Sequence, residues 1–384
     1  MSLIVFPFKQ EDLGVISANL TTAARHHRVS EVWAVAANEG DEMARVSAIA
    51  HRIGTHVSTP IKVFPQEPIG TFRRGKGDGM NTAIQLAAEH GFDRVHFYDA
   101  DITNFDETWI EGAEAAADRG YGVVRHRFPR ASTDAMITWM ITRPSLALFF
   151  PATILPKLGQ PLGGEMLLSR TAVEGLASDS SVRARSDWGV DTMITHATAT
   201  LGVPIYEHNV VEGKRHALYG TLGEIRTMAL ECLDAAISLR GKASPGGSSD
   251  FAADPPAPAP GDLKNTVAYD VNPTIALLST PWEHGERDLI DRLPQPVIAD
   301  ILLNQTTPNF QFMDATAWGT VLNALHEGFR LGDPAWESLA FRVWLIRVLA
   351  YTTTQALQGY DSSLRYLDQT IREYEKLADH HRPT

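Results

Sequence analysis

Cysteine is almost absent from this chain, since Cys232 is the only one among 384 residues. A single cysteine excludes an internal disulfide and a cysteine-rich zinc site. Its helical surroundings indicate a packed small hydrophobic residue, because structural cysteines are usually buried and inert. We therefore expect a cytoplasmic protein, in which thiols stay reduced.

Long apolar runs are also absent. No stretch approaches the roughly 20 apolar residues that a membrane helix needs. The N-terminal run is too short for a signal peptide and follows no basic residues, so it is expected to form a first strand. We expect no membrane partner.

Positive charge is in deficit, because 34 Lys and Arg stand against 46 Asp and Glu, a net charge of −12. This balance excludes a general nucleic-acid binder. It still allows a phosphate-bearing small molecule, which a few local cations and a metal can hold. The hydrophobic content of 44% is that of a globular protein with a proper core.

Short apolar runs alternate with helical patterns through the first half of the chain. This alternation predicts an α/β fold, a mainly parallel sheet with helices on both faces. Ligands of such sheets bind at the carboxyl ends of the strands. The expected strands are Leu3–Phe8, Val32–Ala36, Ile61–Phe64, Val95–Tyr98 and Tyr121–Val124, and helices are expected at Asp41–Ile53, Met80–Glu89 and Trp109–Asp118.

Composition divides the chain into three parts. Residues 1–240 carry the α/β pattern. Residues 241–264 are rich in Gly, Ser, Ala and Pro, so we expect a flexible or semi-extended linker that buries no core. Residues 265–384 show helical spacing, notably in Trp318–Phe329 and Trp336–Leu357, and predict a smaller all-helical C-terminal domain.

Two aspartates one residue apart, Asp99 and Asp101, follow the apolar run Val95–Tyr98. Carboxylates are preferred ligands of Mg²⁺, which typically takes one or two of them together with substrate phosphates. An Asp-x-Asp motif at the end of a strand therefore suits the diphosphate of a nucleotide sugar. The alternative is a solvated turn with a capping aspartate, because the tripeptide is common.

A basic, glycine-rich segment spans Gly70–Gly79. It resembles the phosphate loop of nucleotide hydrolases, but Gly77 stands where Ser or Thr should bind the metal. What remains is a basic turn that enters a helix, whose backbone N–H groups and Lys76 can hold a phosphate. The alternative is an ordinary flexible loop.

Three arginines and several hydroxyl side chains lie in Arg125–Thr138. Ser132 or Thr133 is expected to cap a helix, on which Asp134 and Thr138 would share a face. A guanidinium grips a carboxylate at two points, so the segment suits a small hydroxy acid. The alternative is a basic surface patch with an ordinary helix cap.

Two later segments add a tryptophan and a histidine. Trp188, between Asp187 and Asp191, suits packing against the apolar face of a sugar. His216 can complete a metal site as neutral imidazole, although a lone histidine is more often structural.

Together these segments are similar to the mannosylglycerate synthase family, retaining glycosyltransferases of the GT-A type. The similarity runs from residue 2 to about residue 235 and continues more loosely through the helical part. The motifs that carry it are VFPFK at Val5–Lys9, GKGDGMNTA at Gly75–Ala83, HFYDADIT at His96–Thr103, FPRASTDAMITWMITR at Phe128–Arg143, QPLGGE at Gln160–Glu165, RSDWG at Arg185–Gly189 and EGK at Glu212–Lys214.

The resemblance implies transfer of mannose from GDP-mannose to the 2-hydroxyl of D-glycerate, with a divalent metal, Mg²⁺ or Mn²⁺, as cofactor. The product would be 2-O-(α-D-mannosyl)-D-glycerate, a compatible solute. The residues implied at the donor are Pro7, Phe8, Lys9, Gln10, Glu11, Lys76, Asp99, Leu162 and Asp191, those at the metal are Asp101 and His216, and those at the acceptor are Arg130, Asp134, Ala135, Met136, Ile137, Thr138 and Tyr219.

Lys76 and Asp191 are the residues expected to act in catalysis. Lys76 and the metal would stabilise the departing diphosphate. Asp191 is the best carboxylate candidate for a nucleophile, but attack on the leaving-group face with the leaving phosphate as base is the preferred mechanism.

Other classes remain as alternatives. A sugar nucleotidyltransferase would carry a glycine-rich basic loop after its first strand, where this chain has Lys9–Asp12. A non-catalytic sugar-nucleotide sensor is disfavoured, because both Asp101 and His216 are present. A related hexosyltransferase for another small hydroxy acid fits the same residues. We expect a homo-oligomer.

Overall fold

The computed structural model describes residues 2–216, 219–245, 251–256, 258–264, 266–304 and 310–380. The chain forms two compact units. The first, called the sheet unit here, comprises Met1–Pro129, Lys157–Ala217 and Ala243–Ala259, and the second, the helical unit, comprises Arg130–Pro156, Leu218–Lys242 and Pro260–Thr384. These spatial boundaries differ from the compositional boundaries at residues 240 and 265, which stay a prediction.

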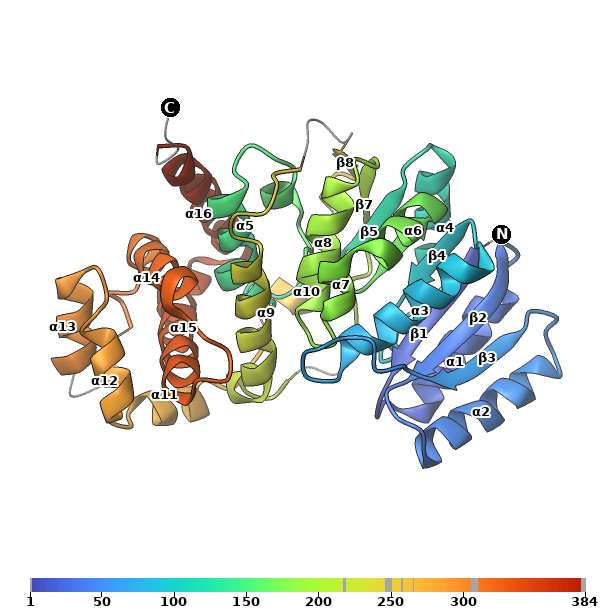
Figure 1. Cartoon of the computed structure of the whole chain (residues 1–384), viewed down its shortest axis with the longest axis horizontal. Helices are drawn as coiled ribbons and strands as arrows, with labels where there is room; N and C mark the ends of the chain where they lie inside the picture. Colours follow the sequence, from blue (N-terminus) through green and yellow to red (C-terminus); the bar gives the residue numbers. More distant parts are fainter. Residues whose placement is uncertain are drawn as a thin grey trace. The chain divides into compact units, whose positions relative to one another are not determined.

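An eight-stranded sheet forms the centre of the sheet unit, in the order β3-β2-β1-β4-β6-β5-β7-β8 (Figure 1). Its pairings are parallel except for those of β6, which runs antiparallel between β4 and β5. The predicted mainly parallel sheet is confirmed, and each predicted apolar run contributes a strand. The strands are β1 Ser2–Phe8, β2 Val29–Ala36, β3 Ile61–Pro65, β4 Arg94–Phe97, β5 Val123–Arg127, β6 Met166–Ser169, β7 Ile205–Asn209 and β8 Phe251–Ala253.

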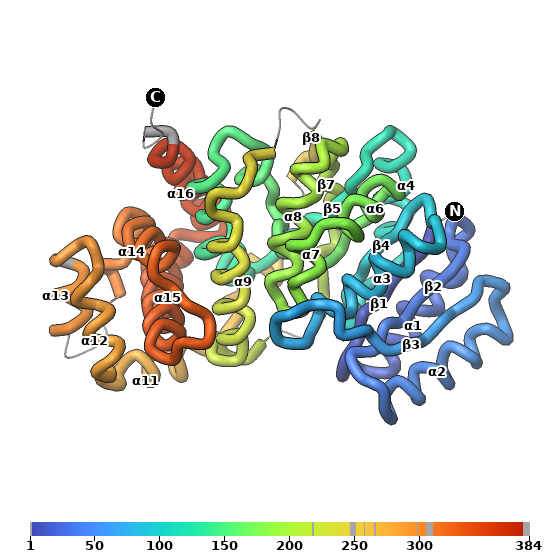
Figure 2. The backbone as a smooth tube through the Cα atoms, in the orientation of Figure 1, coloured from blue at the N-terminus to red at the C-terminus, as the bar shows by residue number. Residues whose placement is uncertain are grey.

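Helices cover both faces of this sheet, as predicted. Because the strands are buried on both sides, their sequences are continuous apolar runs. The helices α3, α6, α7 and α8 pack against one another on one face, and α1 packs against α2 and α4 on the other, an arrangement that Figures 1 and 2 both display. Their bounds are α1 Leu13–Arg25, α2 Asp41–Gly54, α3 Lys76–His90, α4 Glu107–Asp118, α6 Arg170–Ser178, α7 Ser180–Ala184 and α8 Val190–Thr200.

Strand β8 lies within the segment that composition predicts to be a flexible linker. Phe251–Ala253 pairs parallel with β7, and Asp254 accepts hydrogen bonds from His208 Nδ1 (2.8 Å) and the Asn209 backbone N–H (2.9 Å). The structure differs here from the expectation, because ladder hydrogen bonds and a half-buried aspartate hold a chain that has few apolar side chains. Residues 246–250 and 257 of the segment lie outside the described residues.

The helical unit contains the two helices expected near the C-terminus, α14 and α15. Helix α15 begins with Asp333 as cap and Pro334 in the first turn, and it is buried along most of its length from Leu339 to Thr352.

Cys232 on α9 is buried, as predicted. The helices are α5 Arg143–Phe149, α9 Arg226–Ser238, α10 Gly261–Lys264, α11 Asn272–Leu278, α12 His284–Ile290, α13 Pro296–Asn304, α14 Ala315–Gly328, α15 Pro334–Thr354 and α16 Tyr360–His380. Within the described ranges, none of the helices has the length and hydrophobicity that a bilayer span requires.

His326 on α14 is a buried titratable group inside the helical unit. Its Nε2 lies 2.8 Å from Ser145 Oγ, and its ring packs 4.6 Å from that of Phe149. Burial, together with the charge of Arg240, lowers the pKa of His326 from its ordinary 6.5 to about 3. The folded protein therefore holds this imidazole neutral where the unfolded chain would protonate it.

We predict that His326 makes stability depend on pH between about 6.5 and about 3. In this window the unfolded chain binds the extra proton, so the free energy of unfolding falls as the pH falls, by up to about 1.4 kcal/mol per pH unit. Urea denaturation of wild type and His326→Gln at pH 7, 6 and 5 measures the effect. The slope should be smaller in the variant, and equal slopes would contradict the assignment.

Candidate active site

The predicted site residues of the sheet unit lie at one edge of the sheet. The parallel strands β1, β4 and β7 all end there, and the antiparallel β6 begins there, with Met166 paired to Phe97 at the end of β4. The residue before β6, Glu165, is therefore carried to the end of β4, where Asp99 follows. Topology thus brings together four loops that are distant in the sequence.

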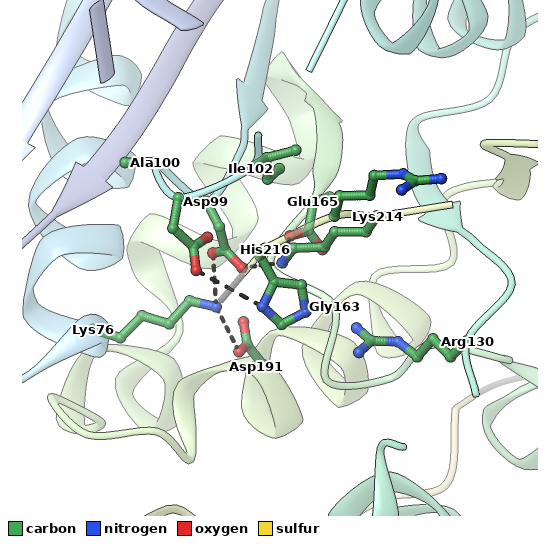
Figure 3. A network of polar contacts seen from close by, with 12 residues as sticks. Lys76, Asp99, Ala100, Ile102, Arg130, Gly163, Glu165, Asp191, Lys214 and His216 are labelled. Atoms are coloured by element: carbon green, nitrogen blue, oxygen red, sulfur yellow. Dashed lines mark hydrogen bonds and ion pairs between the residues drawn. The ribbon is translucent and has the colours of Figure 1, made fainter. Parts of the chain in front are cut away.

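Lys76 is the centre of this cluster. It is the first residue of α3, and its Nζ lies 3.1 Å from Asp191 Oδ2 and 3.4 Å from Asp99 Oδ1, as Figure 3 shows. Asp191 lies in the first turn of α8, where the helix dipole favours a negative charge. The Trp188 ring centroid is 5.8 Å from the same ammonium. The structure therefore brings together three predicted donor residues.

Gly164 lies against this group of charges. A Cβ at this position would come within 2.5 Å of Lys76 Nζ and 3.0 Å of Asp99 Oδ1. Glycine therefore allows the backbone to approach the ammonium and the carboxylate closely, and a side chain here would displace one of them.

A second lysine, Lys214, lies on the other oxygen of Asp99 (Figure 3). Its Nζ is 2.5 Å from Asp99 Oδ2 and also contacts Glu165 Oε1. The side chain of Lys214 is 5% exposed and that of Glu165 is 1% exposed. Neither residue is among the predicted site residues, although both lie in motifs that carry the family resemblance.

Electrostatics favour the charged forms of Lys76 and Asp99. Burial acts to lower the pKa of Lys76, but the carboxylates of Asp191, Asp99 and Glu165 outweigh it and raise that pKa above its ordinary value. Burial acts to raise the pKa of Asp99, yet Lys214 and Lys76 hold it well below its usual range. Burial and the charge of Asp99 raise the pKa of Glu165. Asp99 is therefore the ionised partner of both lysines.

Asp191 is buried with its two oxygens in different environments. Oδ2 accepts from Lys76, whereas Oδ1 is buried without a hydrogen-bond partner among the described residues. Burial raises the pKa of Asp191, and the ammonium of Lys76 acts in the opposite direction. Asp191 Oδ1 is thus a buried polar atom of the site that no described residue satisfies.

Asp101 and His216, the predicted metal ligands, lie beside each other. His216 Nδ1 is 3.8 Å from Asp101 Oδ2. Their loops are joined by hydrogen bonds from the Thr103 backbone N–H to the Arg215 carbonyl and from the Arg215 N–H to Asn104 Oδ1, each 2.8 Å. In the described part of the chain, no three histidine, cysteine, aspartate or glutamate side chains gather closely enough to hold a metal by themselves. A cation here would need ligands from a bound molecule or water.

The predicted donor residues Pro7–Glu11 span the end of β1, with Pro7 and Phe8 in the strand and the other three residues after it. Lys9 and Gln10 are exposed, and the Lys9 backbone N–H donates to Glu11 Oε2 at 2.6 Å. Burial raises the pKa of Glu11, and the charge of Asp101 raises it further. Glu11 therefore lies within electrostatic reach of the aspartate that is expected to bind the metal.

Leu162 lies on a loop that a buried arginine holds. Arg125 Nη2 donates to the carbonyls of Gln160 (3.2 Å), Pro161 (3.2 Å) and Gly163 (3.0 Å). Arg125 is 1% exposed, so at this position the alternative of a basic surface patch is wrong. The guanidinium of Arg125, which lies in the middle of the buried strand β5, fixes the loop instead.

The glycine-rich segment that leads into the first turn of α3 is packed. A Cβ at Gly77 would come within 2.3 Å of the Arg185 carbonyl oxygen, and one at Gly70 within 2.7 Å of Ser186 backbone nitrogen. Asp78 Oδ1 accepts from the Ile69 and Gly70 N–H groups at 3.1 and 3.0 Å. Two motifs of the sequence, Gly70–Gly79 and Arg185–Gly189, therefore form one structure that places Lys76.

The predicted acceptor residues belong to the helical unit. Arg130 Nη1 lies 2.9 Å from Asp134 Oδ2, Ala135 has a left-handed backbone with φ 57°, and the π-helix Thr138–Thr142 follows. Met136 and Ile137 are buried, Thr138 is 4% exposed and Tyr219 is 42% exposed. A residue other than glycine with positive φ is uncommon and marks local strain.

The prediction that Ser132 or Thr133 caps a helix is wrong. Helical backbone starts only at Met136, so Asp134 lies in a turn and shares no helix face with Thr138. Thr133 Oγ1 instead donates to the Thr266 carbonyl at 3.3 Å and accepts from the Ala268 N–H at 2.9 Å. These contacts with a distant segment override the local capping pattern.

An Asp-x-Asp motif at the carboxyl end of β4, in a mainly parallel sheet and beside charged lysines at the start of α3 and after β7, defines a GT-A-type glycosyltransferase. Comparisons narrow the class. A family model described as "Mannosylglycerate synthase, GT domain" matches residues 2–238, and the model of the mannosylglycerate synthase C-terminal domain matches residues 263–371. The chain belongs to the mannosylglycerate synthase family.

Individual relatives agree with this assignment. The chain is 46% identical over 375 residues to a mannosylglycerate synthase of Rhodothermus marinus, covering 97% of this chain and 94% of the relative. It is 43% identical to one of Selaginella moellendorffii, covering 97% and 89%. A solved structure of glucosyl-3-phosphoglycerate synthase from Mycobacterium tuberculosis with phosphoglyceric acid matches with a TM-score of 0.50 and 20% identity, covering 64% of this chain and 82% of that one, and shows a shared fold.

Proposed function

We propose that this chain transfers mannose from GDP-mannose to the 2-hydroxyl of D-glycerate with retention of the anomeric configuration. The observation that carries the proposal is the cluster of Lys76, Asp99 and Asp191 beside the pair Asp101 and His216. The lysines Lys76 and Lys214, together with a pair of metal ligands at the same sheet edge, suit a nucleotide diphosphate sugar. The names of the relatives at 43–46% identity support mannose and glycerate as the two substrates.

Asp101 and His216 would hold a divalent metal, Mg²⁺ or Mn²⁺. One carboxylate and one imidazole suit such a cation, and the 3.8 Å between their atoms fits two ligands of a common ion, which lie at most about 4.3 Å apart. The bound ion would act as a Lewis acid and neutralise negative charge on the leaving diphosphate. A protein with only these two ligands leaves coordination positions for phosphate oxygens.

In the reaction, Lys76 stabilises the negative charge that develops on the departing diphosphate. Asp99, whose side chain keeps 30% of its surface exposed, contacts the nucleotide. Asp191, held by Lys76 through Oδ2, presents its free Oδ1 to the sugar and stabilises positive charge at the anomeric carbon.

The glycerate hydroxyl attacks from the face that the diphosphate leaves, and its proton passes to a leaving phosphate oxygen. Retention follows without a covalent intermediate. Double displacement through Asp191 is the alternative, and it is disfavoured because the contact with Lys76 reduces the nucleophilicity of the carboxylate.

Arg130, with Asp134–Thr138 and Tyr219, would bind glycerate. The guanidinium would bind the carboxylate of the acceptor, since planar two-point pairing is its characteristic contact.

We further propose that the chain consists of a glycosyltransferase domain at 1–240, a linker at 241–264 and a helical C-terminal domain at 265–384, which the spans of the two matched models support. A cytoplasmic location and a homo-oligomer are part of the proposal.

The substrates are tested by product analysis. Purified protein should convert GDP-mannose and D-glycerate to an α-linked mannosylglycerate, whereas GDP-glucose, UDP-glucose and 3-phosphoglycerate should react much more slowly. Nuclear magnetic resonance of the product reads the anomeric configuration and the hydroxyl that is substituted. A β-linked product would contradict retention, and a preference for UDP-glucose would contradict the donor.

The metal assignment is tested by Asp101→Ala and His216→Ala. Each should lower kcat/KM by about a hundredfold or more, roughly 2.7 kcal/mol, because each removes one of the two protein ligands. Chelator should abolish transfer by the wild type. His51→Ala, which removes an exposed histidine of α2, is the matched control and should act like wild type. Full activity of either site variant in excess Mg²⁺ would refute the assignment.

The acceptor role of Arg130 is tested by Arg130→Lys. Lysine keeps the charge but loses the two-point grip, and a hydrogen bond to a charged group contributes roughly 1.5–3 kcal/mol. We expect the KM for glycerate to rise about ten- to a hundredfold. GDP binding, measured by calorimetry, should hardly change, and Arg52→Lys on the exposed face of α2 is the control. Weaker GDP binding with an unchanged glycerate KM would assign Arg130 to the donor.

A further inference from the structure

The two aspartates of the Asp-x-Asp motif have opposite surroundings. Asp99 has a lysine on each oxygen, Lys214 Nζ at 2.5 Å from Oδ2 and Lys76 Nζ at 3.4 Å from Oδ1. Asp101 has an imidazole nitrogen of His216 at 3.8 Å. A metal cation that approached Asp99 would meet two ammonium groups, whereas one that approached Asp101 would meet an imidazole ring, whose nitrogen can itself be a ligand. The motif therefore offers one carboxylate to a cation, although its sequence contains two.

Lys214 is held in place by a third acid. Its ammonium also contacts Glu165 Oε1, and both side chains are almost fully buried. Glu165 reaches this position because it directly precedes β6, the antiparallel strand whose Met166 pairs with Phe97 at the end of β4. Buried ion pairs contribute little net stability, since desolvation offsets their attraction. Their placement beside a motif residue indicates a functional reason.

We propose that Lys214, anchored by Glu165, is a positioning residue that keeps Asp99 from coordinating the metal. The inference rests on the proposed role of Asp101 and His216 as ligands and extends it. With Asp99 paired to Lys214, the protein supplies one carboxylate and one imidazole, and the metal depends on diphosphate oxygens for its remaining ligands. Metal binding thereby becomes coupled to nucleotide binding, and Asp99 stays directed to the nucleotide.

The consequence is measurable without turnover. In Lys214→Met, which keeps the length of the side chain but removes its charge, Asp99 Oδ2 is released and becomes a second carboxylate ligand. We expect Mn²⁺ to bind the nucleotide-free variant about tenfold more tightly than the wild type. Electron paramagnetic resonance of free Mn²⁺ measures this affinity, with and without GDP. The gain in affinity that GDP produces should shrink in the variant.

Control variants test whether the gain in Mn²⁺ affinity depends on the charge of Lys214 and on the carboxylate of Asp99. Lys214→Arg keeps the charge and should bind Mn²⁺ like wild type. Lys62→Met removes an exposed lysine of β3 that pairs with Glu31 of β2. This variant should change the Mn²⁺ affinity less than twofold. The double variant Lys214→Met with Asp99→Asn should lose the tenfold gain, because the released ligand is gone.

Each outcome decides the proposal. An unchanged Mn²⁺ affinity in Lys214→Met, or a gain that survives Asp99→Asn, overturns it. Should Lys214→Met fail to fold, Lys214→Leu gives the same comparison, since it also removes the ammonium from Asp99 Oδ2 and offers no hydrogen bond in its place. If the wild type binds no Mn²⁺ even with GDP, the proposed metal role of Asp101 and His216 fails. That result differs from one in which the wild type binds Mn²⁺ but Lys214→Met does not change the affinity, which contradicts only the positioning role of Lys214.

Discussion

The pairing of two lysines with three acids at the carboxyl edge of the sheet is the interaction on which the site depends. A charge taken out of water costs several kcal/mol unless it meets an opposite charge. Lys76 and Lys214 are largely buried, so each needs a carboxylate within reach, and Asp99 serves both. The loops that carry these residues are therefore constrained together, and a change in one displaces the others.

This constraint accounts for several features that local rules leave unexplained. Gly164 lets the backbone lie close to the Lys76 ammonium, which a side chain at this position would displace. Gly70 and Gly77 are needed because the turn before α3 lies against the backbone of Arg185 and Ser186. Arg125, although charged, is buried under the loop that carries Leu162, and its guanidinium satisfies three backbone carbonyls. Backbone packing thus positions the charged side chains of the site.

Prediction from the sequence succeeds where a pattern is local and periodic. The five early strands appear where continuous apolar runs were read, because strands buried on both faces leave that signature. Helices α14 and α15 follow from their spacing and from the break before Pro334. The cap expected at Ser132 or Thr133 does not form, because Thr133 bonds to residues 266 and 268, which no local rule takes into account. Strand β8 was missed for the same reason, since its ladder partner is β7.

By itself the sequence determined the α/β class, the Asp-x-Asp motif, the lysine that begins α3 and, through family motifs, the likeness to mannosylglycerate synthases. It did not single out Lys214 or Glu165, because a lysine in a polar loop and a glutamate before a short strand look like solvated surface residues. Only the tertiary structure decided their place. The antiparallel insertion of β6 between β4 and β5 carries Glu165 to the end of β4, and the loop after β7 brings Lys214 onto the same aspartate. Charges far apart in the sequence pair there because a buried charge is costly unless an opposite charge lies close to it.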